Sequence, residues 1–189
     1  PFVRLAEVLG SLHAQLVRGR LRRVELYVRG SRLSQGDASA LLSRAVLKGL
    51  LGHVLEEEVN LMNAATLAEE LGLHVSETRE LEWLGRGPST TARVPPSVRV
   101  VLHSDDGTRA LTGAVHEDGR GRLVEVDGMH VDVVPEGEMV FFRNEDRPGI
   151  LKDVTALLME SGVNIASFEV GRKERPSVRT IDQAPSATA

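Results

Sequence analysis

Apolar side chains in the first part of the chain recur mostly at helical spacing. The leading segment places large apolar residues at steps of three and four, namely Phe2, Leu5, Leu9, Leu12 and Leu16. This period predicts an amphipathic helix over residues 1–17. Residues 22–29 instead alternate between polar and apolar, which is typical of a half-buried strand. Two further helices are expected over 37–55 and 64–71, each opened by an Asp or Asn that can cap it.

From residue 73 onward the apolar positions follow a period of two. Short alternating runs predict strands at 73–83, 98–102, 111–115, 123–126 and 129–134. The last two flank Asp127-Gly128, and an Asp-Gly pair between apolar runs favours a tight hairpin because both residues adopt positive φ. We therefore expect residues 1–136 to form an α+β domain with an antiparallel sheet and with its helices grouped early.

A second unit is expected after the Pro135-Glu136-Gly137 boundary. Residues 138–143 are predicted as a strand, 150–161 as a helix and 163–172 as a second strand. This order is a βαβ unit within residues 137–172. Residues 173–189 are dominated by proline and by small or polar side chains, so we expect them to form an irregular tail.

The composition excludes several classes of function. Without cysteine, the chain forms neither disulfides nor zinc–thiolate sites. A net charge of −4 gives no overall attraction to nucleic-acid phosphates, and no apolar run approaches the roughly 18 residues of a membrane span. We therefore expect no nucleic-acid or membrane partner. A local basic run at Arg18, Arg20, Arg22 and Arg23 is either a solvated loop or a contact for a small anion.

No sequence pattern typical of catalysis or metal binding stands out. The glycine pattern of a dinucleotide-binding turn, the P-loop and the HExxH motif are all absent from the sequence. Its six histidines are far apart on different expected elements. A lone histidine is more often a surface or core residue than a ligand. We predict no catalytic residue, no metal site and no cofactor in this chain.

The loop at 144–149 carries the most informative residues. It opens the helix at 150–161, and the first amides of a helix lack intrahelical partners and attract anions. Pro148 fixes φ at this turn and Gly149 leaves room beside the backbone, so Pro148, Gly149 and Ile150 form a candidate anion site. Asn144 and Asp146 flank it, and a carboxylate can hold an ammonium group, which suits a zwitterionic amino acid. The alternative is structural, with Asp146 capping the helix and Pro148-Gly149 shaping the turn.

Three motifs in this second unit resemble an ACT domain: Asn144–Gly149, Glu160–Ala166 and Val170–Arg172. Upstream segments are similar to the intervening domain of D-3-phosphoglycerate dehydrogenases, often called the allosteric substrate-binding domain; they lie at 1–10, 47–51, 59–64, 126–128 and 131–132. Together these motifs cover nearly all of residues 1–172. The chain therefore resembles the C-terminal regulatory region of that enzyme family.

The resemblance implies a role in L-serine biosynthesis. The parent enzyme would oxidise 3-phosphoglycerate with NAD in the first step of that pathway. Its catalytic and NAD-binding domains would precede Pro1, so we expect this chain to be inactive alone. In a homo-oligomer, two ACT domains would bind L-serine between Asn144 and Asp146 of one copy and Asn164 of the other. Arg122 stands where some members contact a phosphorylated effector. The expected location is the cytoplasm, or the plastid stroma in a photosynthetic eukaryote.

The C-terminal unit departs from the βαββαβ order of an ACT domain. Residues 173–189 are too few and too polar to supply the strand, helix and strand that should follow. We therefore expect a truncated ferredoxin-like unit, and the survival of serine binding in it stays open. Two alternative functions remain open. One is a stand-alone ACT-type amino-acid sensor, and the other is the small chain of an L-serine dehydratase, which has a similar two-domain layout.

Overall fold

The computed structural model describes residues 1–30, 33, 37–80, 95–143 and 149–171. Its elements are, in chain order, α1 (Phe2–Leu16), β1 (Leu21–Arg29), α2 (Ala38–Leu51), α3 (Ala64–Glu70), β2 (His74–Glu80), β3 (Ser97–Ser104), β4 (Gly107–Val115), β5 (Gly121–Val126), β6 (Met129–Val133) and α4 (Ile150–Glu160). The predicted α+β class is confirmed. Within the described residues, no helix is long and apolar enough to cross a membrane.

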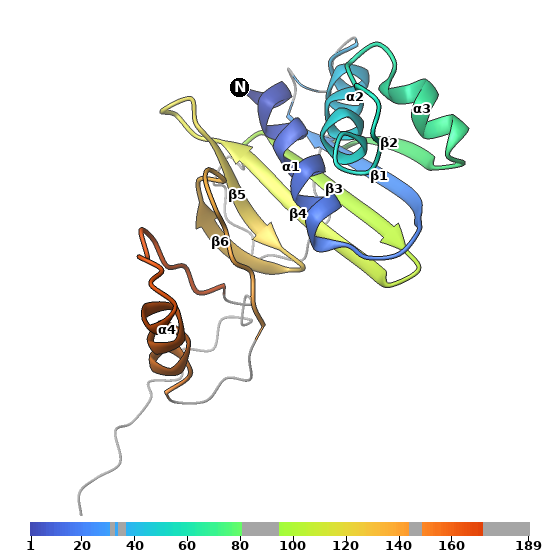
Figure 1. The fold of residues 1–189 in the computed structure, drawn as a ribbon. Coiled ribbons are helices and arrows are strands. Elements are labelled where there is room, and N and C mark those ends of the chain that lie inside the picture. Colours follow the sequence, from blue (N-terminus) through green and yellow to red (C-terminus); the bar gives the residue numbers. More distant parts are fainter. Residues whose placement is uncertain (31–32, 34–36, 81–94, 144–148, 172–189) are drawn as a thin grey trace, which may run out of the picture.

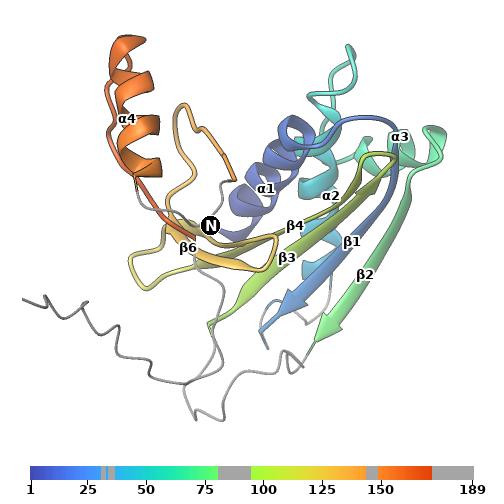
Figure 2. The ribbon, with the colours of Figure 1, turned by 90° about the horizontal axis from the view of Figure 1, so that it is seen from below.

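Six strands form one sheet in the order β2-β1-β3-β4-β5-β6. The helices α1 and α2 lie side by side over one face of this sheet (Figures 1 and 2). Strands β3 to β6 are joined by hairpins and pair antiparallel, as expected. Strand β2 instead pairs in parallel with β1, because α2 and α3 return the chain to the same end of the sheet before β2 begins. The sheet is therefore mixed at this edge.

The two helices over the sheet cross at a pair of glycines. A Cβ atom added at Gly49 would lie 1.9 Å from the carbonyl oxygen of Glu7 in α1. A Cβ added at Gly10 would lie 2.0 Å from the carbonyl oxygen of Val46 in α2. Any side chain at these positions would push the helices apart. Backbone contact at both sites therefore lets α1 and α2 form one tight layer, with many dispersion contacts per residue.

Leu5 anchors this helical layer to the sheet. Its side chain is 3% exposed and lies above two glycines, one in β4 and one at the start of β5. A Cβ added at Gly113 would come within 2.9 Å of Leu5 Cδ1, and one at Gly121 within 3.1 Å. The absence of side chains at these two positions leaves the space that Leu5 fills. Burial of a leucine side chain stabilises a fold by roughly 1.5–3 kcal/mol.

His13 is a polar residue within this core. Its side chain is fully buried, and Nε2 lies 3.1 Å from the carbonyl oxygen of Val100 in β3. A carbonyl only accepts hydrogen bonds, so Nε2 carries the proton and Nδ1 is the free acceptor. Nδ1 has no partner among the described residues. Burial lowers the pKa of His13 to about 4, so the ring is neutral near pH 7.

The predicted turn forms as expected, whereas the predicted helix caps make no capping hydrogen bond. Asp127 and Gly128 have φ of 49° and 80°, so the Asp-Gly pair forms the predicted tight hairpin between β5 and β6. The expected caps Asp37 and Asn63 occupy the N-cap positions of α2 and α3, but neither makes a side-chain capping hydrogen bond. The side chain of Asn63 bonds within the preceding loop instead, where it accepts from the amide of Asn60.

The C-terminal unit is built on α4, which confirms the predicted helix. Neither expected strand, at 138–143 or at 163–171, forms in the described part of the unit. A strand requires backbone hydrogen bonds to a neighbouring strand. These two segments contact each other through the Phe142 and Phe168 rings, whose centroids are 6.1 Å apart. No residue of α4 is buried, and Figure 1 shows the helix set apart from the sheet.

Replacing Gly49 by alanine tests the helix crossing. The new methyl group would overlap the Glu7 carbonyl, so α1 and α2 would have to separate. We expect Gly49→Ala to lower the free energy of unfolding by about 3 kcal/mol or more, the upper end of overpacking effects, as measured by chemical denaturation. Gly52→Ala is the matched control. Gly52 has an ordinary helical φ of −63°, and a Cβ there would lie 3.0 Å from the carbonyl oxygen of Lys48, so a small shift accommodates it and the loss should be about 1 kcal/mol or less. Equal losses in both variants would contradict this account.

His13 predicts a loss of stability in mild acid. Its pKa in the folded state is about 4, against an ordinary value of 6.5, so the unfolded chain binds the proton more readily. Stability is therefore complete above pH 6.5 and falls as the pH drops from 6.5 towards 4. Between pH 7.5 and pH 5 this one group should cost about 2 kcal/mol of unfolding free energy. Denaturation at several pH values should show a shallower loss for His13→Asn, and parallel profiles would count against the buried neutral ring.

Candidate effector-binding sites

The N-terminus of α4 holds the part of the predicted amino-acid site that the structure describes. Gly149 is its N-cap with φ of 90°, and Ile150 is the first helical residue. A Cβ at Gly149 would meet nothing within 4 Å, so glycine is favoured there by the backbone conformation and not by crowding. The other predicted residues of this site, Asn144, Asp146 and Pro148, lie outside the described residues. Their role stays a prediction.

Asn164 lies beyond the other end of the same helix. Gly162 ends α4 with φ of 73°, and the amide of Val163 donates to the carbonyl of Leu158 at 2.9 Å, a left-handed helix stop. A helix of 11 residues is about 16 Å long. Asn164 and Gly149 therefore cannot face one ligand within a single chain. The contribution of Asn164 from a second copy stays a prediction.

Arg122, the predicted contact for a phosphorylated effector, is held by two carboxylates. Its guanidinium donates to Asp132 at 2.9 Å and lies 3.8 Å from Asp118. The hydrogen bond to Asp132 raises the pKa of Arg122 further above its ordinary value. An anion at this position would compete with both aspartates. Arg122 therefore serves first to tie β5 to β6 and to the turn before β5.

A cavity of about 380 Å³ opens where the two units meet. Its walls come from the end of α1, the β3–β4 hairpin, the β5–β6 turn and the segment before α4; the lining residues are Val17, Ser104, Asp106, Gly107, Thr108, Arg109, Ala110, Asp127 and Arg143. Arg109 donates to one carboxylate oxygen of Asp127, while the other oxygen accepts the amide of Ala110 at 3.0 Å. Arg143 makes no hydrogen bond or ion pair with another described residue. The cavity is therefore polar. Among the described residues, Arg109 has a carboxylate partner and Arg143 has none.

Few features of the sequence predict this cavity. Arg109 and Arg143 lie far apart in the chain, and neither belongs to a recognisable motif. The basic run supplied a partial signal, because Arg18 follows the lining residue Val17 directly. Arg22 of the same run pairs with Asp105 at 2.7 Å, next to the hairpin that forms one wall. Only the tertiary fold brings these segments together.

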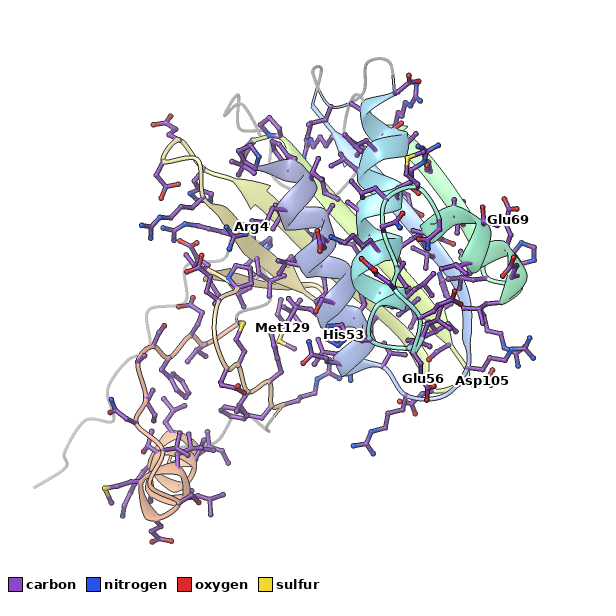
Figure 3. All side chains as sticks on the ribbon, turned by 45° about the horizontal axis from the view of Figure 1, so that its top comes forward. Arg4, His53, Glu56, Glu69, Asp105 and Met129 are labelled. Carbon is purple, nitrogen blue, oxygen red and sulfur yellow. The ribbon has the colours of Figure 1, made fainter. Side chains whose placement is uncertain are left out.

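The polar contacts elsewhere do not assemble a catalytic site. Ser11 Oγ lies 2.6 Å from His53 Nε2 on the exposed surface, and Figure 3 shows His53 beside the last turns of α1. Neither Ser11 nor His53 lines the cavity beside the β3–β4 hairpin, and no third described residue forms a hydrogen bond that orients the His53 ring. The described residues contain no group of three or more His, Asp or Glu that could hold a metal ion.

The residues present do not fit a dinucleotide such as NAD. In the described part of the chain, strand β1 enters helix α2 through residues 30–37, and β2 pairs in parallel beside β1. A Rossmann-type turn needs glycines spaced G-x-G-x-x-G between strand and helix. Residues 30–37 read Gly-Ser-Arg-Leu-Ser-Gln-Gly-Asp, which lacks that spacing. No chemical step through a nicotinamide follows from this chain.

Comparison with known proteins assigns each of the two units to a family of domains. Residues 1–127 match the model of the D-3-phosphoglycerate dehydrogenase intervening domain, and residues 139–186 match the ACT domain. The ACT match thus extends into the segment that we expected to be an irregular tail.

The curated relatives carry a consistent name. D-3-phosphoglycerate dehydrogenase of Synechocystis is 36% identical over 92% of this chain and 30% of its own length. The enzyme of Methanocaldococcus jannaschii is 33% identical over 92% of this chain and 31% of its own, and D-3-phosphoglycerate dehydrogenase 3, chloroplastic, of Arabidopsis thaliana is 30% identical over 98% and 33%. The chain spans about a third of the length of these relatives. With its first 127 residues matched to the intervening-domain model, the chain belongs to the D-3-phosphoglycerate dehydrogenase intervening-domain family, followed here by an ACT domain.

Proposed function

We propose that this chain is the regulatory and oligomerisation portion of a D-3-phosphoglycerate dehydrogenase. The parent enzyme would oxidise 3-phosphoglycerate with NAD, in the cytoplasm or in the plastid stroma of a photosynthetic eukaryote. The observation that carries the proposal is the tandem order of an intervening domain and an ACT domain in one chain. The chain itself would hold no NAD and would catalyse nothing alone.

The proposed effector of the ACT unit is L-serine. The free amides at the start of α4 would receive its carboxylate, with Asn144 and Asp146 beside them. Asn164 of a second copy would complete the site, since within one chain it lies at the far end of α4. The carboxylate of Asp146 would hold the ammonium group of the amino acid. Binding of this end product would make the activity of the enzyme depend on the concentration of L-serine.

The exposed apolar side chains of the C-terminal unit support a homo-oligomer. Leu157 is 64% exposed and Met159 is 72% exposed on α4, and Val140 before the helix is 75% exposed. Large apolar side chains exposed in such number on one small unit are typical of an interaction site. A second copy of the unit would cover this surface and would bring Asn164 towards the Asn144–Gly149 loop.

L-Serine should stabilise the chain if the ACT unit is a working sensor. At a hundred times its dissociation constant, a ligand raises the unfolding free energy by about 2.7 kcal/mol, which thermal unfolding resolves. Asp146→Ala should remove this effect by deleting the ammonium contact. Asp118→Ala, at an exposed turn far along the chain, should keep it, and D-serine should give a much smaller shift. A full L-serine shift in Asp146→Ala would refute this site.

Introducing a charge at Leu157 tests the oligomer. We expect the wild-type chain to sediment as a dimer or larger assembly and Leu157→Glu to sediment as a monomer, because a buried unpaired carboxylate would destabilise the interface by several kcal/mol. Met62→Glu is a matched control, since Met62 is 82% exposed but lies in the first domain. If the wild-type chain is a monomer at all accessible concentrations, the proposed pairing is wrong.

A further inference from the structure

We propose that Thr108 in β4 carries an activated hydroxyl group and is a site of covalent acylation by activated carboxylic acids, such as thioesters, acyl phosphates and active esters. The groups that activate it come from two neighbouring strands, β3 and β1. Together they form a chain of contacts that runs from a hydroxyl through an imidazole to a carboxylate. Acylation here would not depend on the effector binding proposed above.

The strand register brings these groups onto one surface. Alternate residues of β1 are buried under the helices, so Glu25 and Tyr27 face the other side of the sheet (Figure 2). The same alternation in β3 places His103 on that side. His103 and Thr108 are direct partners in the β3–β4 register, and directly opposed residues point to the same face of a sheet. Thr108, His103 and Glu25 therefore share one surface.

His103 links the hydroxyl group to the carboxylate. Its Nδ1 lies 3.0 Å from Oγ1 of Thr108, and its Nε2 lies 3.3 Å from Oε1 of Glu25. Nε2 is buried and forms no well-aligned hydrogen bond, so its contact with Glu25 is electrostatic. The negative charge beside it favours the tautomer with the proton on Nε2. Nδ1 then keeps its lone pair and accepts the hydrogen bond of the Thr108 hydroxyl.

Glu25 is held in place as an ionised carboxylate. The hydroxyl of Tyr27 donates to Oε2 at 2.7 Å, and Arg23 donates to Oε1 at 3.2 Å. The Tyr27 hydrogen bond is the largest cause that lowers the pKa of Glu25; desolvation opposes it, and Arg23 and the charge of His103 add to it. A fixed carboxylate beside Nε2 orients the imidazole ring and stabilises the positive charge that the ring gains with a second proton.

The chemistry that this arrangement supports is transfer of an acyl group to Thr108. Oγ1 forms a bond to the carbonyl carbon of the donor while its proton passes to Nδ1 of His103. The bond to the leaving group then breaks, and a thiolate, a phosphate or a phenolate departs with the electron pair. His103 returns the proton to the leaving group or to water. The product is an ester on Thr108, and no group is oxidised or reduced.

The contacts select donors that are already activated. They act on the nucleophile and not on the oxyanion that forms on the acyl carbonyl, so the donor must bring a good leaving group of its own. Unactivated amides should not react, and the product ester should persist, which makes Thr108 a modification site and not a catalyst. Thr108 is exposed and lines the cavity beside the β3–β4 hairpin, so a small donor has access to it.

Acetylation of the full chain by p-nitrophenyl acetate and by acetyl phosphate, followed by peptide mass spectrometry, tests the site. Thr155 and Ser161 are internal references, because their hydroxyl groups donate to backbone carbonyls instead of to an imidazole. We expect Thr108 to react at least about tenfold faster than either, since a positioned base accelerates such steps by roughly 10²–10⁴-fold. Alkaline hydroxylamine should remove the label, because it cleaves an ester and leaves the amides formed on lysines.

Variants of the contacting residues identify the cause of this reactivity. His103→Gln should lower the rate at Thr108 at least about tenfold, and Glu25→Gln should lower it severalfold. Glu125→Gln is the matched control, because the Glu125 side chain is only 17% exposed and pairs with Arg99; it should leave the rate unchanged. Thr108→Ser should keep acetylation at position 108, and Thr108→Val should abolish it there.

The pH dependence separates a base from a merely structural histidine. Only a neutral imidazole accepts a proton, so the ratio of the Thr108 rate to the Thr155 rate should rise between roughly pH 5 and pH 8. Glu25 and its partner Arg23 are the charged groups beside the ring among the described residues. The ratio should stay flat in His103→Gln, whose folding is checked by chemical denaturation. The proposal is overturned if Thr108 reacts no faster than Thr155, or if folded His103→Gln reacts as fast as the wild-type chain.

Discussion

Backbone contact between α1 and α2 at Gly10 and Gly49 is the constraint on which the rest of the first domain depends. Because the helices touch without intervening side chains, they act as one layer over the sheet. That layer holds α1 close enough for Leu5 to fill the space above Gly113 and for His13 to reach the carbonyl of Val100. The last turn of the same helix leads to the cavity wall. The distance between the two helices in the core therefore determines where this wall of the cavity lies.

The two halves of the chain differ in how far they bury their apolar side chains. The first buries a continuous Leu- and Val-rich core between helices and sheet, as a self-sufficient domain does. In the second, α4 buries none of its residues, and the adjoining segments lack the strand pairing that an α+β layer needs. Apolar surface of this extent is stable in water only when another surface covers it. The proposed homo-oligomer would supply such a cover for the C-terminal unit.

Local patterns in the sequence predicted elements whose causes are local. The Asp127-Gly128 turn and the period of α1 depend on neighbours a few residues away, so both were predicted correctly. The parallel pairing of β1 with β2 depends on the path through α2 and α3, which no short pattern records. The strands expected around α4 did not form in the described residues. An alternating pattern shows that a segment suits a strand, but a strand also needs a neighbouring strand to hydrogen-bond with. The cavity escaped prediction for the same reason as the parallel pair: Arg109 and Arg143 meet only in the tertiary fold.

The contrast between Arg122 and Arg143 shows how the function of a charge depends on its surroundings. Arg122 lies between Asp132 and Asp118. An anionic ligand there would have to compete with two carboxylates that already neutralise the guanidinium. Arg143 has no such partner among the described residues and lines the cavity of about 380 Å³. Similarity to a family locates a basic residue, but the ion pairs around that residue decide whether it is available to bind.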